Sequence, residues 1–295
     1  MHPQLLLSIC NVAAYPRPSC LLRLNVETQG KEWVDIGFGA NLVSGSGIFA
    51  DDRFVYHAYV AQAAQSTNVT ILDRATFEVL HVQNLPEVDD VHSLCRIGDE
   101  LLVASTGTDQ ILAYPMDGFA LGSPREVWSP TNSGTDTHHV NSLAHIGGEL
   151  FCTAFGLKEG ESWSTARTGY VRNVTSGATV LSGLRQPHSV TWHDGQLYVC
   201  NSAEGSVTAD DEPVAYFSGY ARGLAFAPDG TMYVGTSLAR RPMQPTDDVG
   251  IFDNPTGEGA LHGACAVIHM APDGTNRFEI AIPPFGNEIY DILVL

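Results

Sequence analysis

The sequence predicts an all-β fold, a six-bladed β-propeller built from four-stranded antiparallel blades. Three observations support this prediction: a hairpin pattern that recurs along the chain, a spacing of 47 to 49 residues between four of its copies, and terminal segments that complement each other as parts of one sheet. We expect residues 1–295 to form a single propeller domain. The main alternative is an open β-sandwich of similar strands.

The recurring hairpin begins with a polar and a small residue, continues as an aliphatic strand, turns at Gly or Asp, and returns as an apolar strand. Its copies are GSGIFADDRFVYHAY (45–59), VHSLCRIGDELLVAST (91–106), VNSLAHIGGELFCTAF (140–155), PHSVTWHDGQLYVCNS (187–202) and ARGLAFAPDGTMYVGTS (221–237). Two more short strands follow each hairpin, as QILAYP and REVWSP do after the second copy. The repeating unit is therefore a four-stranded antiparallel sheet.

The sixth blade is divided between the two ends of the chain. The segment NEIYDILVL (287–295) resembles a first strand, and LLLSICN (5–11) resembles a second strand. We expect 289–295 to pair with 5–11, and SCLLRLNV (19–26) and EWVDIG (32–37) to complete the sheet. This pairing of the C-terminal strand with the N-terminal strands closes the ring and leaves no open sheet edge.

Composition excludes some classes of protein. The formal net charge is −18, which disfavours nucleic-acid binding because that function requires a basic surface. No apolar run approaches the roughly 18 residues of a membrane span, and the N-terminus lacks the features of a signal peptide. The six cysteines mostly lie in apolar strand patterns, without a C-x-x-C pair. We expect a cytoplasmic protein with no membrane or nucleic-acid partner, and a protein partner stays open.

The first strand of each propeller blade lines the central channel, so equivalent positions at the strand starts should converge. The residues at these positions are Gly45, His92, Asn141, His188, Arg222 and Tyr290. Two residues earlier lie Val43, Asp90, His139, Gln186, Tyr220 and Glu288. Period-two alternation puts both sets on one side of their strands, so we expect His139 to point toward the axis and His138 away from it. The ends of the second strands add Asn11, Tyr59, Thr106, Phe155, Asn201 and Ser202 to the same rim.

The candidate catalytic residues are His92, His139, His188 and Tyr290. One interpretation is that the three histidines bind a divalent metal, since imidazole suits Zn, Mn or Fe. A second is general acid–base chemistry, in which Asp90 or Glu288 pairs with a histidine. A third is a polar lining around ordered water. Tyr290 is either a proton donor or a hydroxyl tied to a neighbouring blade.

Arg222 is the leading candidate to anchor a substrate carboxylate or phosphate, because guanidinium binds such groups through two hydrogen bonds. The alternative for this side chain is an ion pair with Asp291 or Glu288. Other candidate substrate-binding residues are Asp90, Asn141, Asn201, Arg240, Arg241 and Glu288. Two long segments, 156–168 and 238–265, are long enough to cover the mouth, and the second carries the Arg240–Arg241 pair.

Several motifs resemble those of a bacterial family of β-propeller proteins catalogued as a domain of unknown function. They are H-V-N-S (139–142), T-A-F-G (153–156), P-H-S (187–189), W-H-D-G (192–195), R-G-L (222–224), G-T-S-L-A-R-R (235–241) and E-I-Y-D-I-L-V-L (288–295). The chain departs from the family pattern at Thr153, where the family has Ser, and by one inserted residue before Arg240. The resemblance implies a six-bladed fold and a role near surface-sugar or natural-product pathways, and it leaves the reaction open.

Our leading hypothesis is an enzyme of lyase, isomerase or hydrolase type that acts on a small anionic, sugar-derived or biosynthetic substrate in the channel. The chain shows no nucleophile elbow, phosphate loop or dinucleotide fingerprint in context, which disfavours redox chemistry with a nucleotide. The alternative is a non-catalytic propeller that binds a ligand or docks a protein. Calcium-dependent lactone or phosphoester hydrolysis ranks lowest, because it needs a ring of Glu, Asp and Asn where this chain has histidines.

Overall fold

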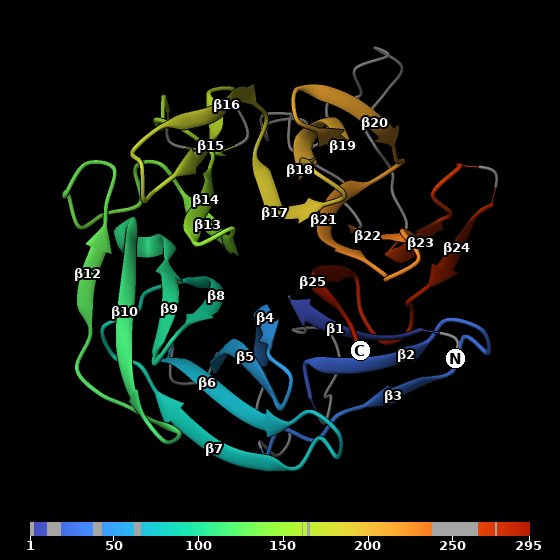
Figure 1. Cartoon of the computed structure of the whole chain (residues 1–295), viewed down its shortest axis with the longest axis horizontal. Coiled ribbons are helices and arrows are strands. Elements are labelled where there is room, and N and C mark those ends of the chain that lie inside the picture. The colour runs from blue at the N-terminus through green and yellow to red at the C-terminus, as the bar shows by residue number, and fades with distance from the viewer. Residues whose placement is uncertain are drawn as a thin grey trace.

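The hairpin repeats fold into six antiparallel sheets that surround a central axis, which confirms the predicted six-bladed propeller (Figure 1). The computed structural model describes residues 3–10, 19–37, 43–61, 66–160, 162–163, 166–237, 265–274 and 276–295. None of the helical turns in these ranges is long and apolar enough to cross a membrane.

Each sheet is given from its innermost to its outermost strand. The divided blade contains β25 (Glu288–Val294), β1 (Gln4–Cys10), β2 (Leu21–Asn25) and β3 (Lys31–Trp33). The next contains β4 (Val43–Ala50), β5 (Phe54–Ala61), β6 (Ser66–Asp73) and β7 (Val79–Asn84). The third contains β8 (Val91–Ile97), β9 (Glu100–Ser105) and β10 (Gln110–Asp117), with β11 (Ala120–Leu121) and β12 (Arg125–Trp128) both paired to β10.

The remaining blades follow the same order. The fourth contains β13 (Val140–Ile146), β14 (Glu149–Ala154), β15 (Gly169–Asn173) and β16 (Thr179–Leu184). The fifth contains β17 (Pro187–His193), β18 (Gln196–Asn201), β19 (Ser206–Ala209) and β20 (Glu212–Tyr216). The sixth contains β21 (Tyr220–Phe226), β22 (Met232–Ser237), β23 (Ala266–Met270) and β24 (Arg277–Ala281). Two 3₁₀ turns, η1 (Thr106–Thr108) and η3 (Ser202–Glu204), follow β9 and β18.

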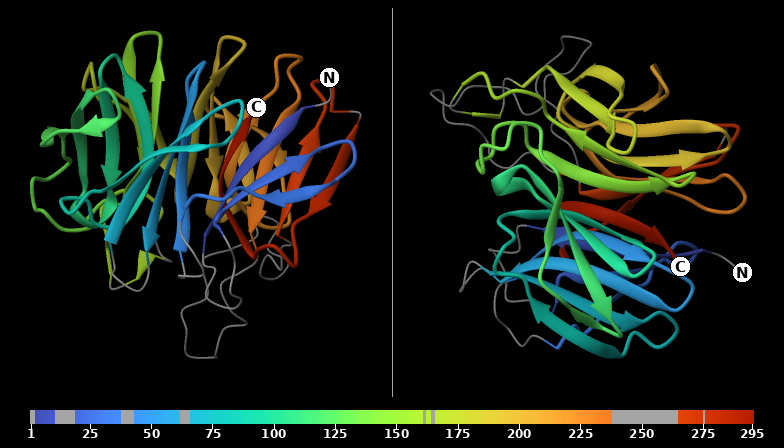
Figure 2. Two further views of the ribbon diagram at one scale, coloured as in Figure 1. Left: turned by 90° about the horizontal axis from the view of Figure 1, so that it is seen from below. Right: turned by 60° about the vertical axis from the view of Figure 1, so that its left-hand side comes forward.

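The ring closes through the two ends of the described chain, as the sequence predicted. β25 runs antiparallel to β1, with Leu5 opposite Val294 and Cys10 opposite Glu288. Figure 1 shows β25 between β1 and the channel, and Figure 2 shows the inner strands running side by side along the axis. The blade is thus shared between segments that are far apart in sequence.

Burial explains why inner and outer strands have different sequence patterns. β1 packs against a neighbouring blade on each side, and its residues Leu5, Leu6 and Leu7 are all fully buried. The sequence of a strand that is buried on both faces is a continuous run of apolar residues. The outermost strand β7 has one face toward solvent and alternates half-buried with exposed residues.

The hydrophobic core is divided among the blade interfaces. Six clusters of buried side chains occur in the described part of the chain, and each joins two neighbouring blades. For example, Tyr56 and Val69 of one blade pack with Leu101 and Tyr114 of the next. Burial of one such side chain contributes roughly 1.5–3 kcal/mol. Each blade is therefore stabilised mainly by its two neighbours.

The inner strands are also joined directly around the channel, by residues one or two positions after the strand starts. Ser93 Oγ accepts a hydrogen bond from Leu143 N at 3.1 Å, and Ser189 Oγ accepts one from Gly223 N at 2.9 Å. Ser142 Oγ and Asp291 Oδ2 bond Ser189 N and Ile48 N in the same way. Glycines complete the ring, because a Cβ at Gly47 would lie 2.6 Å from Ser93 Cα and one at Gly223 would lie 3.1 Å from Asp291 Cα. We call these contacts the inner ring.

Candidate functional site

The predicted histidines and Tyr290 lie together at the end of the channel where the inner strands begin. The ring centroids of His92 and His139 are 4.9 Å apart, and those of His92 and Tyr290 are 5.4 Å apart. His188 lies 6.4 Å from Tyr290 and 5.2 Å from Phe155. We call this end of the channel the mouth. Four blades therefore contribute aromatic side chains to one continuous lining.

His92 and His188 are held by the same backbone device. The residues two positions earlier, Asp90 and Gln186, adopt left-handed conformations with φ of 50° and 53°. Their carbonyl oxygens turn back toward the histidines and lie 2.9 and 3.0 Å from Nδ1 of His92 and His188. A carbonyl can only accept a hydrogen bond, so Nδ1 of each ring carries the proton. Nε2 of each neutral ring is left with its lone pair.

Burial keeps both rings neutral. The pKa of His92 is lowered to about 4, chiefly by burial, and the nearby Asp90 carboxylate only partly opposes this. The pKa of His188 is well below its usual value because of burial and then because of Arg222. His188 is 1% exposed, and its Nε2 has no hydrogen-bond partner in the structure. A buried acceptor without a partner is costly and is a natural contact point for a ligand.

His139 has a different environment. Its Nδ1 lies 3.2 Å from both carboxylate oxygens of Asp136, and Asp136 also accepts a 2.8 Å hydrogen bond from Trp163 Nε1. Burial alone would raise the pKa of Asp136, but the hydrogen bonds from His139 and Trp163 outweigh it and lower the pKa. The ring of His139 packs against both Phe155 and Trp163, with centroid distances of 4.3 and 5.0 Å. Asp136 therefore orients His139 as a carboxylate orients a catalytic imidazole.

His138 lies on the other side of the chain, as alternation predicted. It contacts Asp109 at 3.9 Å and the ring of Tyr170 at 6.3 Å. The reason differs from the predicted one, because Asp90, His139 and Gln186 are left-handed residues before their strands rather than extended residues within them. The carbonyl of His139 accepts a hydrogen bond from Asn141, which repeats the device of the other two blades.

Arg222 lies beneath the histidines between two tyrosine rings. Its guanidinium carbon is 5.0 Å from the Tyr220 ring and 4.9 Å from the Tyr290 ring. The side chain is 8% exposed, Nε has no hydrogen-bond partner, and Nη1 makes one long contact of 3.8 Å with Cys10 Sγ. Within the described ranges Arg222 forms no ion pair, so the alternative pairing with Asp291 or Glu288 is not seen.

Tyr290 and Glu288 come from β25 of the divided blade. Burial raises the pKa of the Tyr290 hydroxyl well above its usual value, so this group is a hydrogen-bond donor at neutral pH. Glu288 is 6% exposed, and its carboxylate accepts a 3.3 Å contact from Cys10 Sγ. Cys10 thus lies between Arg222 and Glu288. Tyr290 faces the mouth, whereas Glu288 packs behind Arg222.

Two predicted binding residues use their side-chain hydrogen bonds within the fold. The side chain of Asn141 donates to the carbonyls of His139 and Pro187 and accepts from Ser142 and Thr153, which uses its full hydrogen-bonding capacity. Asn201 accepts from Arg185 N at 2.6 Å and donates to Glu204 at 2.8 Å. Both amides position backbone at the mouth and leave little capacity for a substrate.

Other predicted rim residues have mixed positions. The Asp90 side chain is 53% exposed and lies 3.6 Å from Nδ1 of His92, so it remains accessible to a ligand. Tyr59 stacks on His57 in the core, and Thr106 bonds the carbonyl of Val140, so neither lines the mouth. Asn11, Arg240 and Arg241 lie outside the described residues.

The segment after β14 contributes to the site, as its length suggested. Trp163 covers His139, its carbonyl accepts a 2.8 Å hydrogen bond from Gln186 Nε2, and Lys158 Nζ lies 4.9 Å from its ring. Gln186 in turn accepts from the Tyr220 hydroxyl at 3.0 Å. Asp136 and Trp163 were not among the predicted site residues. The D-x-x-H spacing of Asp136 and His139 was the sequence signal for the first, and nothing in the periodic pattern indicates the second.

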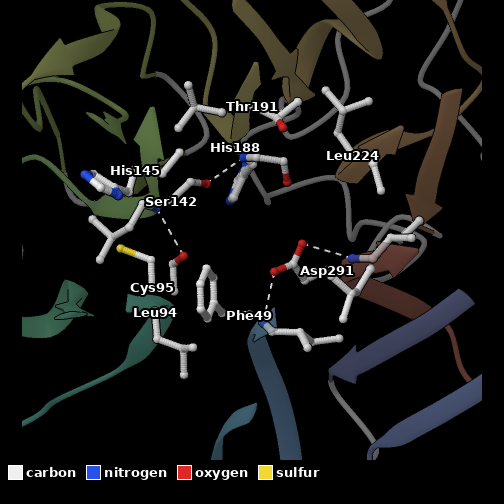
Figure 3. Close-up of a pocket in the computed structure, with 18 of the residues that line it drawn as sticks. Phe49, Leu94, Cys95, Ser142, His145, His188, Thr191, Leu224 and Asp291 are labelled. Atoms are coloured by element: carbon white, nitrogen blue, oxygen red, sulfur yellow. Dashed lines mark hydrogen bonds between the residues drawn. The ribbon is translucent and has the colours of Figure 1, made fainter. Parts of the chain in front are cut away.

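The mouth continues into an axial cavity of about 580 Å³ that opens on the opposite face. All six inner strands line it, and His92, His188 and Tyr290 form its inner end. Figure 3 shows His188 and Asp291 on the walls of the same space. The histidines of the mouth are therefore bordered by the axial cavity.

Comparison with known proteins gives a family and a fold. The model of the family described as a domain of unknown function (DUF4915) matches residues 65–295. No curated protein matches the sequence.

Solved structures with similar folds cover most of the chain. A protein of unknown function from Bacteroides caccae has a TM-score of 0.64 at 12% identity, covering 100% of this chain and 99% of that one. A candidate 6-phosphogluconolactonase from Bacteroides fragilis has a TM-score of 0.60 at 14% identity, covering 99% and 98%. A PQQ-bound aldose sugar dehydrogenase from Streptomyces coelicolor has a TM-score of 0.57 at 14% identity, covering 85% and 84%. At these identities the likeness shows the fold alone.

Proposed function

The chain belongs to the DUF4915 family, and we propose that it is an enzyme that converts a small anionic, sugar-derived molecule at the mouth by acid–base chemistry. The reaction class that suits the side chains is a non-redox one: hydrolysis, elimination or isomerisation. The sugar names of two propellers of similar fold select sugar acids as the first substrates to test.

The environment of Arg222 is the observation that carries this proposal. A guanidinium keeps its charge inside a protein, and burial without a carboxylate partner is costly. Arg222 is almost fully buried, stacks between two tyrosines and leaves Nε without a partner. A ligand carboxylate or phosphate would place a negative charge in direct contact with the guanidinium and, by its geometry, accept two hydrogen bonds.

His188 is the base in this proposal. Gln186 holds the proton on Nδ1, so the lone pair on Nε2 is available to take a proton from the substrate. The charge of Arg222 is one cause of the low pKa of His188. An anion bound to Arg222 would cancel part of that effect and raise the pKa of His188 in the complex. The base therefore becomes stronger when its substrate is in place.

Tyr290 and His92 complete the proposed chemistry. The Tyr290 hydroxyl is protonated, lies beside both histidine rings, and is suited to donate a proton to a leaving oxygen or to stabilise a developing oxyanion. His92 offers a second unprotonated Nε2 on the opposite side of Tyr290. His139, oriented by Asp136, is placed to exchange protons with His92.

Metal binding by His92, His139 and His188 stays a separate prediction. The free Nε2 atoms of His92 and His188 are suitable donors, yet Phe155 lies between His139 and His188 in the lining. Within the described ranges, no three His, Cys, Asp or Glu side chains are grouped to hold one ion. The chemistry above is therefore derived from the side chains alone. Elemental analysis of the native protein beside a His92/His139/His188 triple-alanine variant checks the prediction, and stoichiometric Zn, Mn or Fe lost in the variant would support it.

The test of the proposal is binding of 6-phosphogluconate, D-gluconate and inorganic phosphate, measured by titration calorimetry. We expect at least one of these anions to bind the native protein and Arg222→Met to weaken it at least tenfold, since a buried charge-assisted contact is lost. Arg125→Met is the matched control, because Arg125 pairs with Glu100 on the exposed side of a blade. Equal binding by the native protein and Arg222→Met would overturn the anchoring role.

A second measurement separates catalysis from simple binding. His188→Ala should keep the affinity for the anion that binds and abolish the turnover detected by NMR of the substrate mixture. Turnover unchanged in His188→Ala would contradict its role as the base. Binding with no turnover by the native protein would favour the alternative of a ligand-binding propeller.

A further inference from the structure

The axial cavity on the face opposite the mouth has a polar inner end and walls that combine polar and apolar side chains. Its inner end is formed by His92, His188, Tyr290 and the carboxyl group of Asp291. Further along the same strands, the walls combine the apolar side chains of Phe49, Phe226 and Leu293 with the polar side chains of Ser142, His145 and Thr191. Figure 3 shows Phe49, Leu94 and Leu224 around the space that Asp291 faces. A strand rises about 3.3 Å per residue, so the walls extend roughly 10 Å beyond Asp291.

Among the described residues of this lining, Asp291 is the only acidic one and none is Lys or Arg. Its Oδ2 accepts a 3.0 Å hydrogen bond from Ile48 N and its Oδ1 a 2.9 Å bond from Ile292 N. A carboxylate accepts about four hydrogen bonds, so roughly half of its capacity remains. Among the described residues no cation lies within ion-pair distance of Asp291. Its side chain is half-buried and directed into the cavity.

A second feature of the cavity also points to a ligand. His188 lines the inner end, is 1% exposed, and carries the acceptor Nε2 without a partner. An ammonium group is a hydrogen-bond donor only, so it complements both a carboxylate and an unprotonated imidazole nitrogen. The apolar side chains of the wall, among them Phe49, Phe226 and Leu293, would contact a hydrocarbon body.

We infer that the axial cavity binds an organic ammonium ion with an apolar body, which enters from the face opposite the mouth and places its ammonium group against Asp291. The charged group of this site is Asp291, whereas Arg222 is not among the described residues that line the cavity; the two sites border each other at His188 and Tyr290. The chemical class of ligand is an alkylamine or an amine that carries a comparable apolar group.

The behaviour of Asp291 with pH supports the inference and sharpens its test. Burial raises the pKa of Asp291 to about 7, with the two backbone hydrogen bonds opposing this in part. The other titratable groups of the lining are His92, Cys95, His145, His188 and Tyr290. The Asp291 carboxyl is therefore about one-tenth ionised at pH 6 and about nine-tenths ionised at pH 8, whereas an alkylamine stays protonated at both.

The experiment is titration calorimetry of the full chain with n-hexylammonium chloride at pH 8 and pH 6. We expect saturable binding at pH 8 that weakens about tenfold at pH 6, because only the carboxylate form binds the ammonium group. 1-Hexanol and hexanoate are the matched probes without a positive charge, and both should bind at least tenfold more weakly at pH 8. Equal affinity for hexylammonium and hexanol would overturn the inference and indicate an apolar cavity only.

Two variants locate the site. Asp291→Asn should remove the preference for hexylammonium over hexanol and the dependence on pH. Thr191→Tyr narrows the cavity, leaves Asp291 in place, and should weaken both probes together, so it remains informative if Asp291→Asn does not fold. Arg222→Met should bind hexylammonium as the native protein does, which distinguishes this site from the one at the mouth. Unchanged affinity in a folded Asp291→Asn or Thr191→Tyr variant would overturn the inference.

Discussion

At the scale of single residues, the chemistry of the mouth depends on backbone conformation as much as on side-chain identity. Asp90 and Gln186 take left-handed conformations that cost a non-glycine residue roughly 1–2 kcal/mol. The cost is offset because each carbonyl then fixes the proton of a buried histidine two residues later. The result is a pair of imidazoles whose reactive nitrogen is set before any ligand arrives.

We predict that His92 and His188 are neutral, with the proton on Nδ1, from pH 8 down to about pH 5. The low pKa values caused by burial keep both rings uncharged in this range. Long-range ¹H–¹⁵N correlation spectra of ¹⁵N-histidine-labelled protein report the tautomer directly, and His92→Gln and His188→Gln variants assign the two signals. Protonated Nε2, or titration of either ring near pH 6.5, would contradict the hydrogen bond from Nδ1 to the backbone carbonyl two residues earlier.

At the scale of elements, the inner ring explains why glycine or serine follows so many of the strand-start positions. Serine Oγ atoms bridge to the backbone of the next inner strand, and Gly47 lets its strand approach Ser93 closely. These contacts set the distance between neighbouring blades at the axis. They therefore fix how far apart His92, His188 and Tyr290 stand across the mouth.

We predict that Gly47→Ala destabilises the protein by about 1–3 kcal/mol, because the new Cβ would lie 2.6 Å from Ser93 Cα and force the strands apart. The measurement is the midpoint of urea unfolding followed by far-ultraviolet circular dichroism. Gly160→Ala is the control, since no atom lies within 4 Å of a Cβ there, and it should change stability by less than about 0.5 kcal/mol. Equal stability of both variants would show that the inner ring tolerates added volume.

The elements themselves were predictable because one hairpin recurs. Tight turns such as IGDE fix the register of the strands on either side, so the positions of His92, Asn141 and His188 at strand starts followed from spacing alone. The pairing of 288–294 with 5–10 followed from the need to complete a sheet. These predictions succeeded because period and register are local properties.

Other parts of the site depend on conformations that the hairpin repeat of the sequence does not predict. The contact of Trp163 with His139 comes from an irregular segment, and the saturation of Asn141 depends on four partners in two blades. The alternation argument placed His139 correctly at the mouth but missed the left-handed backbone that puts it there. The residue type alone does not tell whether the hydrogen-bonding groups of a side chain are already used within the fold.

At the scale of the whole molecule, stability is distributed over six interfaces and includes several buried ionisable groups. In the described part of the chain each interface has one hydrophobic cluster, so the blades share their cores with their neighbours. His57, within the blade of β4–β7, is fully buried and its pKa is lowered to about 3 by burial. Together with His92 and His188 it makes folding sensitive to acid.

We predict that the free energy of unfolding falls as the pH is lowered from about 6.5 to 5. In this window the unfolded chain binds protons at these histidines that the folded chain excludes, so acid favours unfolding. At pH 5 the loss is about 2 kcal/mol each for His57 and His92. The pKa of Asp291 is raised, so between about pH 4 and 7 the folded chain binds a proton there that the unfolded chain does not. Acid therefore stabilises the folded state at this residue, which offsets the loss from one histidine.

The measurement is urea unfolding at pH 5, 6, 7 and 8. His57→Gln should reduce the pH dependence by about one proton, whereas His145→Gln, at an exposed position, should leave it unchanged. A native protein whose stability is constant across this range would rule out the neutral burial of the three histidines.

The divided blade has a consequence for how the protein becomes active. Glu288, Tyr290 and Asp291 lie on β25, and β25 takes its place only by joining β1. The strand of this propeller that is synthesised last therefore completes both proposed sites at the moment it closes the ring. A nascent or truncated copy that stops before Glu288 lacks the proton donor, the acidic group of the cavity and the seam of the ring together. Incomplete copies would thus be inactive rather than partly active, because both sites form only when the ring closes.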